Sequence, residues 1–210
     1  MLTKDFKPVR YSETIITELM VPSYANFEGN IHGGIILSLM DKVAYVCAAK
    51  HSNSYCVTAS IDAVDFLAPI AVGELVSFHA SVNYVGKTSV VVGIRVVAEN
   101  VKTHSVKHTN ISYFTMVAIG DNNKPTTVPG LILENQKEVI KFIEAIKRKR
   151  LKQEFKNSIA DVSKSIDIEM EKQLLTTERC IIASGCGEDV LSAIYTDSQL
   201  YQEEYRLGVH

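Results

Sequence analysis

The sequence carries almost no excess of charge of either sign. Its 22 Lys and Arg residues stand against 24 Asp and Glu residues, which gives a formal net charge of −2 over 210 residues. A protein that holds nucleic acid through the overall field of the molecule is far more basic, because the phosphate backbone supplies most of the affinity. We therefore expect no nucleic-acid partner, and any anionic ligand must meet a local cluster of basic side chains.

Long hydrophobic runs are also missing, although 46% of the residues are hydrophobic, a content too high for a disordered chain. No segment approaches the roughly 18 to 20 apolar residues of a membrane-spanning helix, so we expect no membrane span. The polar segment 1–7 has no apolar stretch typical of a secretory signal. The four cysteines show no C-x-x-C pair and no metal-ligand spacing. These features favour a reduced, cytoplasmic location and no metal site.

What the sequence does contain is one long apolar helix set among strands. Residues 31–50 repeat apolar side chains at helical spacing, and a helix that is apolar on most sides is expected to be buried. Alternating and β-branched residues predict strands at 9–20, 55–66, 75–84, 88–99 and 110–119. A sheet wrapped around its helix buries both elements, which predicts one α+β domain over residues 9–130.

The composition changes after Gly130, where charged residues become frequent and strand-forming residues rare. This predicts a helical C-terminal extension over residues 131–210, of unknown role. Its expected helices cover 134–156, 159–175 and 189–205. The basic run Lys147–Arg150 lies near the end of the first helix, and we expect it to be a solvated helix face and not a phosphate-binding patch.

Asp41 is the only acidic residue in the predicted long helix. An unpaired carboxylate in apolar surroundings costs several kcal/mol, so we expect Asp41 to be neutralised, paired or functional. The adjacent Lys42 cannot be its partner, because neighbouring helical side chains point apart. Two interpretations stay open: a structural aspartate bonded to backbone or to a tyrosine, and a catalytic base.

The segment 26–34 leads into this helix and contains two adjacent glycines, Gly33 and Gly34. Glycines let another group approach the backbone, and the first turn of a helix presents unsatisfied N–H groups at the positive end of the helix dipole. Such a terminus can hold a developing oxyanion. The alternative is a glycine-rich helix start with Asn30 as its N-cap. Neither a Walker loop nor a dinucleotide-binding fingerprint is present.

Taken together, these segments resemble the hotdog-fold acyl-CoA thioesterases, and within them the cytosolic acyl-CoA hydrolase family. The resemblance covers about residues 11–129 and is specific because its pieces keep their order and spacing. They are Asn26-x-x-Gly29-Asn30-x-His32-Gly33-Gly34, Asp41, Cys56-Val57-Thr58-Ala59, Asp65-Phe66-Leu67-Ala68-Pro69 and Gly73-Glu74. It implies a hotdog fold, in which a curved antiparallel sheet wraps a long central helix. It also implies homodimers that pair their sheets edge to edge, and trimers of such dimers.

The resemblance also implies which residues form the site, at the interface of two subunits. Asp41 of one subunit is expected to act as general base on a water, and Asn26 of the other to orient the water or the substrate carbonyl. The backbone N–H groups at Gly33 and Gly34 are expected to form an oxyanion hole. Further residues implied are His32, which lines the site, Asp65, which braces the helix start, and Lys87, Thr88 and Ser89, which contact the phosphates of coenzyme A.

The function implied by the resemblance is hydrolysis of fatty acyl-CoA to a free acid and coenzyme A. We expect no metal and no redox cofactor, with coenzyme A present only as part of the substrate and product. The alternative is a non-catalytic regulator that binds acyl-CoA on the same fold, since a fold does not determine a function. A hydroxyacyl dehydratase is disfavoured, because the helix offers Asp41 without a suitable adjacent histidine.

Overall fold

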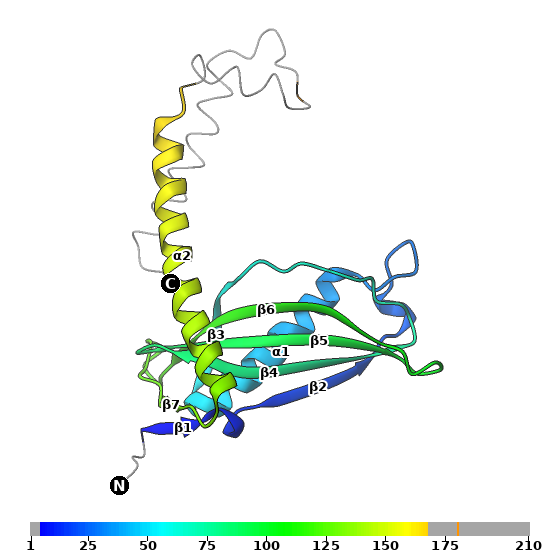
Figure 1. Cartoon of the computed structure of the whole chain (residues 1–210), viewed down its shortest axis with the longest axis horizontal. Coiled ribbons are helices and arrows are strands. Elements are labelled where there is room, and N and C mark those ends of the chain that lie inside the picture. Colours follow the sequence, from blue (N-terminus) through cyan, green and yellow to red (C-terminus); the bar gives the residue numbers. More distant parts are fainter. Residues whose placement is uncertain (1–4, 168–179, 181–210) are drawn as a thin grey trace. The chain divides into compact units, whose positions relative to one another are not determined.

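A computed structural model describes residues 5–167 and Cys180, and all structural statements below concern these residues (Figure 1). The helix predicted at 189–205 lies outside them. In chain order, the elements are β1 (Phe6–Pro8), η1 (Val9–Tyr11), β2 (Thr14–Leu19), η2 (Pro22–Tyr24), α1 (Gly33–Ser52), β3 (Tyr55–Ile61), β4 (Glu74–Val85), β5 (Ser89–Asn100), β6 (Val106–Ile119), β7 (Gly130–Ile132) and α2 (Gln136–Ser165).

Five strands form one sheet in the order β2-β4-β5-β6-β3, and every neighbouring pair in it is antiparallel. The long helix α1 lies against one face of this sheet (Figure 1). β3 is an edge strand, because β6 is its one neighbour among the strands of residues 5–167. The predicted α+β hotdog architecture, a curved antiparallel sheet around a central helix, is confirmed.

The core lies between α1 and the inner face of the sheet. The strand alternation predicted for β4 and β5 is confirmed, because one face of each strand is almost completely buried while the other is more exposed. On α1, the buried residues recur at helical spacing. The main core residues are Ile36, Met40, Val43 and Cys47 of α1, Val76, Phe78 and Val82 of β4, Val90, Val92, Ile94 and Val96 of β5, and Phe114 and Met116 of β6.

One side of α1 stays open in the single chain. Ser38, Lys42 and Tyr45 are exposed, and Asp41 is half-buried beside them. This side faces β3, where the sheet ends, since the Tyr45 ring lies 5.8 Å from the ring of Tyr55. The expectation that the helix is buried on most sides therefore fails along the sheet edge, where no further strand covers it.

Several element boundaries differ from the prediction. The strand predicted at 9–20 begins only at Thr14, after a 3-10 turn, and the short parallel pair of β1 and β7 was not predicted. α1 begins at Gly33 with His32 as its N-cap, so Asn30 is not the cap. The helices predicted at 134–156 and 159–175 are continuous as far as Ser165.

The chain divides into two compact units, residues 1–150 and 151–210, and the division falls within α2. The domain boundary predicted at residue 130 stays a prediction.

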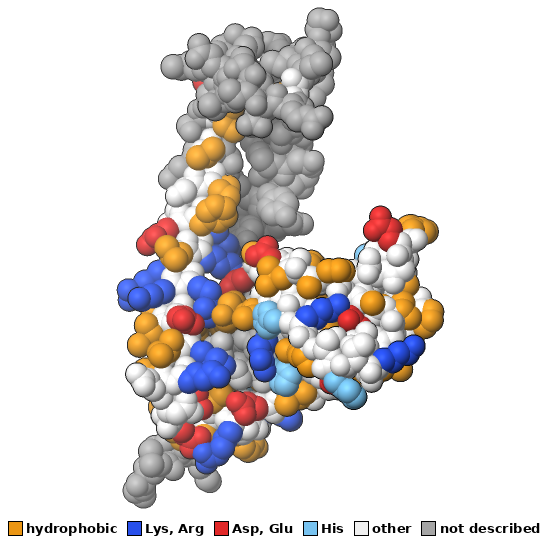
Figure 2. Space-filling view, turned by 45° about the vertical axis from the view of Figure 1, so that its right-hand side comes forward, with side chains coloured by type: hydrophobic (Ala, Val, Ile, Leu, Met, Phe, Trp, Pro, Cys, Tyr) orange, Lys and Arg blue, Asp and Glu red, His pale blue; other side chains and the backbone are white. Residues whose placement is uncertain are grey.

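In the first unit, α2 packs on the outer face of the sheet: the Phe142 ring lies 5.2 Å from that of Tyr84, and Arg148 lies 3.5 Å over the ring of Tyr113. Lys and Arg side chains gather on this part of α2 (Figure 2). The run Lys147–Arg150 is therefore only partly solvated. None of the helices in the described part of the chain has the length and apolarity needed to cross a membrane.

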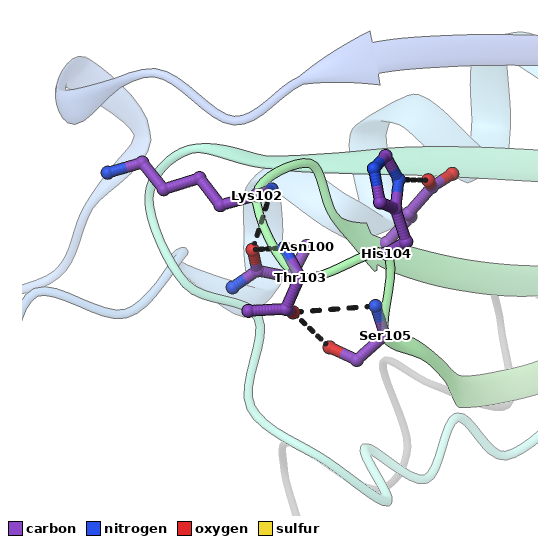
Figure 3. Close-up of polar contacts among 6 residues, drawn as sticks. Asn100, Lys102, Thr103, His104 and Ser105 are labelled. Carbon is purple, nitrogen blue, oxygen red and sulfur yellow. Dashed lines mark hydrogen bonds and ion pairs between the residues drawn. The ribbon is translucent and has the colours of Figure 1, made fainter.

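The turn between β5 and β6 is held by its own polar side chains (Figure 3). Asn100 Oδ1 accepts hydrogen bonds from the N–H groups of Lys102 (3.0 Å) and Thr103 (3.2 Å). His104 adopts a positive φ of 57°, and the hydroxyls of Thr103 and Ser105 lie 2.9 Å apart. These contacts fix the point at which β6 begins.

Candidate active site

Asp41 lies in the middle of α1 and meets β3. Thr58 Oγ1 donates a hydrogen bond to Asp41 Oδ1 at 2.5 Å, and the same hydroxyl lies 3.4 Å from Met116 Sδ. Asp41 has no ion pair with any described residue. The carboxylate is therefore held by a neutral donor and keeps acceptor positions for a water or a proton. The sequence had suggested backbone or tyrosine as its structural partner, and the observed partner is Thr58.

The edge of β3 beside this pair is open and apolar. Tyr55 is 61% exposed and Val57 and Ile61 are each 37% exposed, although all three lie on a strand of the main sheet. An unpaired strand edge of this length presents free N–H and C=O groups and favours pairing with another chain. Asp41 and Thr58 therefore lie beside a surface that suits a second subunit.

Asn26 lies in the loop before α1 and is exposed. Its Oδ1 accepts hydrogen bonds from the N–H groups of Glu28 (3.0 Å) and Asn30 (3.1 Å). Gly29 completes this turn with a φ of +83°, a conformation that favours glycine. The side-chain oxygen of Asn26 is thus hydrogen-bonded within the loop. The Nδ2 group has no acceptor among the described residues, and it is the end that can donate to a ligand.

The start of α1 is organised differently from the prediction. His32 Nδ1 accepts a hydrogen bond from Gly34 N–H at 3.0 Å, so His32 has a capping role. Of the two N–H groups predicted for an oxyanion hole, that of Gly34 is already engaged, which leaves Gly33 N–H. The Phe66 ring packs directly against Gly33, because a Cβ placed there would lie 3.2 Å from Phe66 Cζ.

Asp65 is exposed and makes no hydrogen bond or ion pair with the residues that the structure describes. The segment around it is held by backbone groups instead. Asp62 N–H donates to Tyr113 O and Leu67 N–H donates to Thr109 O, both at 2.9 Å. These bonds tie the segment to β6, and Phe66 reaches the helix start at Gly33. The bracing role of Asp65 stays a prediction.

Lys87, Thr88 and Ser89 lie at the turn from β4 to β5. The turn is closed by Gly86 N–H, which donates to Ser89 O at 2.8 Å, and the Lys87 side chain is exposed. Ser89 pairs with Val117 of β6, which itself pairs with Val57 of β3. The turn therefore lies at the end of the sheet next to the row that contains Thr58.

One protomer does not bring Asn26 and Asp41 together. Asp41 follows Gly33 by eight helical residues, a rise of about 12 Å along α1, whereas Asn26 precedes the helix. No contact between the two is found in the described part of the chain. A hollow of about 500 Å³ lies under α2 on the outer face of the sheet, and no predicted site residue lines it. The fold of one chain therefore shows Asn26 and Asp41 as two separate groups.

Comparison with known sequences identifies relatives of this chain. A family model described as the thioesterase superfamily matches residues 28–104. Protein VdlD of Helicobacter pylori is 45% identical over 141 residues, which are 67% of this chain and 80% of that protein. The uncharacterized acyl-CoA thioester hydrolase YkhA of Bacillus subtilis is 32% identical over 148 residues, 70% of this chain and 86% of the relative. The cytosolic acyl coenzyme A thioester hydrolase of Rattus norvegicus is 32% identical over 146 residues, 69% of this chain but 38% of that protein.

Solved structures of the same kind share the fold. A hexameric acyl-CoA thioesterase, solved in its apo form, superposes with a TM-score of 0.69 at 37% identity and covers 71% of this chain and 96% of its own. An acyl-CoA hydrolase from Staphylococcus aureus in complex with butyryl coenzyme A superposes with a TM-score of 0.66 at 30% identity, over 75% of this chain and 99% of its own. Alanine variants of that enzyme have been solved at an asparagine, an aspartate and a threonine, whose spacing equals that of Asn26, Asp41 and Thr58.

The family match at residues 28–104 contains α1, β3, β4 and β5, and so it contains Asp41 and Thr58. In several of these matches, the aligned part makes up most of the relative's own chain. The similarity therefore extends well beyond one motif. The chain belongs to the family of hotdog-fold acyl-CoA thioesterases.

Proposed function

We propose that this protein hydrolyses the thioester bond of fatty acyl-CoA and releases a free acid and coenzyme A. The observation that carries the proposal is the Asp41 carboxylate, held by Thr58 beside an open subunit edge. The S. aureus hydrolase with bound butyryl coenzyme A supports the substrate class, and its alanine variants at the same spacing support the choice of residues.

In the proposed reaction, Asp41 removes a proton from a water molecule while the water oxygen attacks the thioester carbon. The carbonyl oxygen becomes an oxyanion, which accepts hydrogen bonds from Asn26 Nδ2 and Gly33 N–H. The carbon–sulfur bond then breaks, and the proton held by Asp41 passes to the sulfur of coenzyme A. A positioned base of this kind contributes on the order of 10² to 10⁴-fold to the rate. The reaction needs no metal and no redox cofactor.

The site is proposed to form between two copies of the chain that pair their β3 edges. Asn26 and Gly33 then come from one subunit and Asp41 and Thr58 from the other, so that each homodimer contains two sites. The open apolar edge of β3 supports this pairing. Similar chains whose structures are named hexameric support the further assembly of three dimers.

The proposal also includes the residues that bind coenzyme A and the location of the protein in the cell. Lys87, Thr88 and Ser89 contact the phosphates of coenzyme A, since the turn lies near Thr58 and carries an exposed ammonium group. His32 and Asp65 line the approach to the site. A cytoplasmic location is supported by the relative named a cytosolic thioester hydrolase.

The test is release of free thiol from a panel of acyl-CoA substrates of increasing chain length, by the wild type and by Asp41→Asn. We expect saturable hydrolysis by the wild type and a loss of about 10² to 10⁴-fold in Asp41→Asn. Size-exclusion chromatography and circular dichroism are expected to show an unchanged oligomer and fold. Turnover that survives in Asp41→Asn would contradict the role of Asp41. Tight binding of acyl-CoA without thiol release by the wild type would instead identify a non-catalytic regulator.

A further inference from the structure

Glu74 and Lys107 form an ion pair beyond the proposed catalytic groups. Glu74 Oε1 and Lys107 Nζ lie 2.8 Å apart, with side chains that are 9% and 35% exposed. Glu74 begins β4 and Lys107 lies at the start of β6, so the pair spans β5. The small, fully buried Ala98 pairs with Lys107 at this crossing and leaves room for the two long side chains to meet.

The second carboxylate oxygen of Glu74 holds a loop. Glu74 Oε2 accepts a hydrogen bond from Ala71 N–H at 2.8 Å, and Ala71 O accepts one from Glu74 N–H at 3.2 Å. The carboxylate therefore joins Lys107 on one side to the backbone of Ala71 on the other. A charged acceptor with two donors makes stronger hydrogen bonds than a neutral group would.

The loop held in this way lies beside the loop that carries Asn26. Ala71 forms a β-bridge with Asn30, and Ile31 N–H donates to Ile70 O at 2.8 Å. Asn30 in turn contacts Asn26 twice: its O accepts from Asn26 N–H at 2.6 Å, and its N–H donates to Asn26 Oδ1 at 3.1 Å. A series of hydrogen bonds, with the β-bridge between Ala71 and Asn30 as one step, thus leads from the ion pair to the amide of Asn26.

We propose that the Glu74–Lys107 pair positions the Asn26 amide for the reaction, an inference that rests on the proposed function. Neither residue touches the reacting atoms, so both are positioning residues. Removing the Lys107 ammonium leaves the buried Glu74 carboxylate without its counter-ion, and the carboxylate then turns toward water and releases Ala71 N–H. Asn30 loses its fixed neighbour, and Asn26 Nδ2 loses its direction toward the substrate carbonyl.

The test compares Lys107→Met with Lys7→Met, because each variant deletes one ammonium group, that of Lys107 from the Glu74 carboxylate and that of Lys7 from backbone at the end of α1. Lys7 Nζ donates to Lys50 O (3.1 Å), His51 O (2.6 Å) and Asn53 Oδ1 (2.9 Å) at the C-terminal end of the helix, away from Asn26. Lys7→Met therefore controls for lost stability. Lys107→Arg, which keeps the charge, tests rescue. If Lys107→Met does not fold, Lys107→Gln takes its place with the same readouts.

We expect Lys107→Met to lower kcat by about 10-fold to 100-fold with KM unchanged, since a misplacement of about 1 Å costs up to that much. Lys107→Arg is expected to keep most of kcat, and Lys7→Met to keep the wild-type kcat with a lower thermal midpoint. Equal kcat in Lys107→Met and the wild type, or an equal loss in Lys7→Met, would overturn the proposal.

A second readout does not depend on activity. Hydrogen exchange of the free protein, followed by mass spectrometry, is expected to speed up over residues 24–34 and 66–74 in Lys107→Met and not in Lys7→Met. Unchanged exchange over residues 24–34 would contradict the positioning role even if the enzyme is active. A wild type that releases no thiol would contradict only the proposed function, because the exchange measurement still tests the connection between the two loops.

Discussion

Replacement of Thr58 with valine removes one hydroxyl and leaves a side chain of nearly the same shape. That hydroxyl donates to Asp41 Oδ1 at 2.5 Å, and Thr58 lies on β3 beside the proposed base. A hydrogen bond to a charged acceptor contributes about 1.5–3 kcal/mol. If Asp41 needs this bond to face the water, the full amount is lost from the transition state. The expected loss in kcat is then about 10-fold to 150-fold, since about 1.4 kcal/mol corresponds to a factor of ten.

The assay is steady-state thiol release, with kcat and KM determined for the wild type, Thr58→Val and Thr58→Ser. Serine keeps the hydroxyl and is expected to keep most of kcat. Because Thr58 is exposed, valine is expected to leave the thermal midpoint close to that of the wild type. If Thr58→Val turns over like the wild type while Asp41→Asn is inactive, the hydrogen bond does not hold the base and the reasoning fails.

Two further predictions concern stability. Burial, together with the nearby Lys7 ammonium, lowers the pKa of His51 below its usual 6.5, against the opposing effect of its bond to Pro129 O. The unfolded chain therefore binds a proton below pH 6.5 that the folded chain does not. The free energy of unfolding is thus highest above pH 6.5 and falls as the pH drops. In urea denaturation at fixed protein concentration, this free energy should fall less steeply with pH in His51→Gln than in the wild type. A Cβ on Gly93 would lie 2.3 Å from the buried Asn83 Nδ2. Gly93→Ala is thus expected to lower the free energy of unfolding by about 1–3 kcal/mol, and an unchanged urea midpoint would show that the outer face repacks freely.

The sheet could be predicted because its alternation follows from local chemistry. Val76, Phe78 and Val82 recur at every second position and are buried as expected. The same alternation puts Ser81 and Asn83 on the opposite face, yet both are buried there. Nothing in the strand itself indicates that α2, more than fifty residues later, covers this part of the face. Burial on the outer face was therefore beyond the reach of local patterns.

The site could be predicted only in part. Asp41 is conspicuous as the one acid of an apolar helix, and its role as a base comes from the resemblance. Thr58 belongs to one of the motifs, but the sequence indicates no role for it, because a threonine in a strand is ordinary and its contact joins residues of different elements. The cap assigned to Asn30 belongs to His32, since the helix begins two residues later than the apolar pattern does. This shift also leaves Gly34 N–H engaged by His32.

The central claim is that each site combines Asn26 of one subunit with Asp41 of the other, and subunit mixing tests it most directly. Two inactive chains, Asn26→Ala and Asp41→Asn, are co-expressed with different tags, and the mixed oligomer is isolated and assayed for thiol release. In the isolated mixed dimer one of the two sites is intact, so about half of the wild-type activity returns. If both residues act within one subunit, no mixed dimer contains an intact site. Activity no higher than that of the two variants alone would contradict the account.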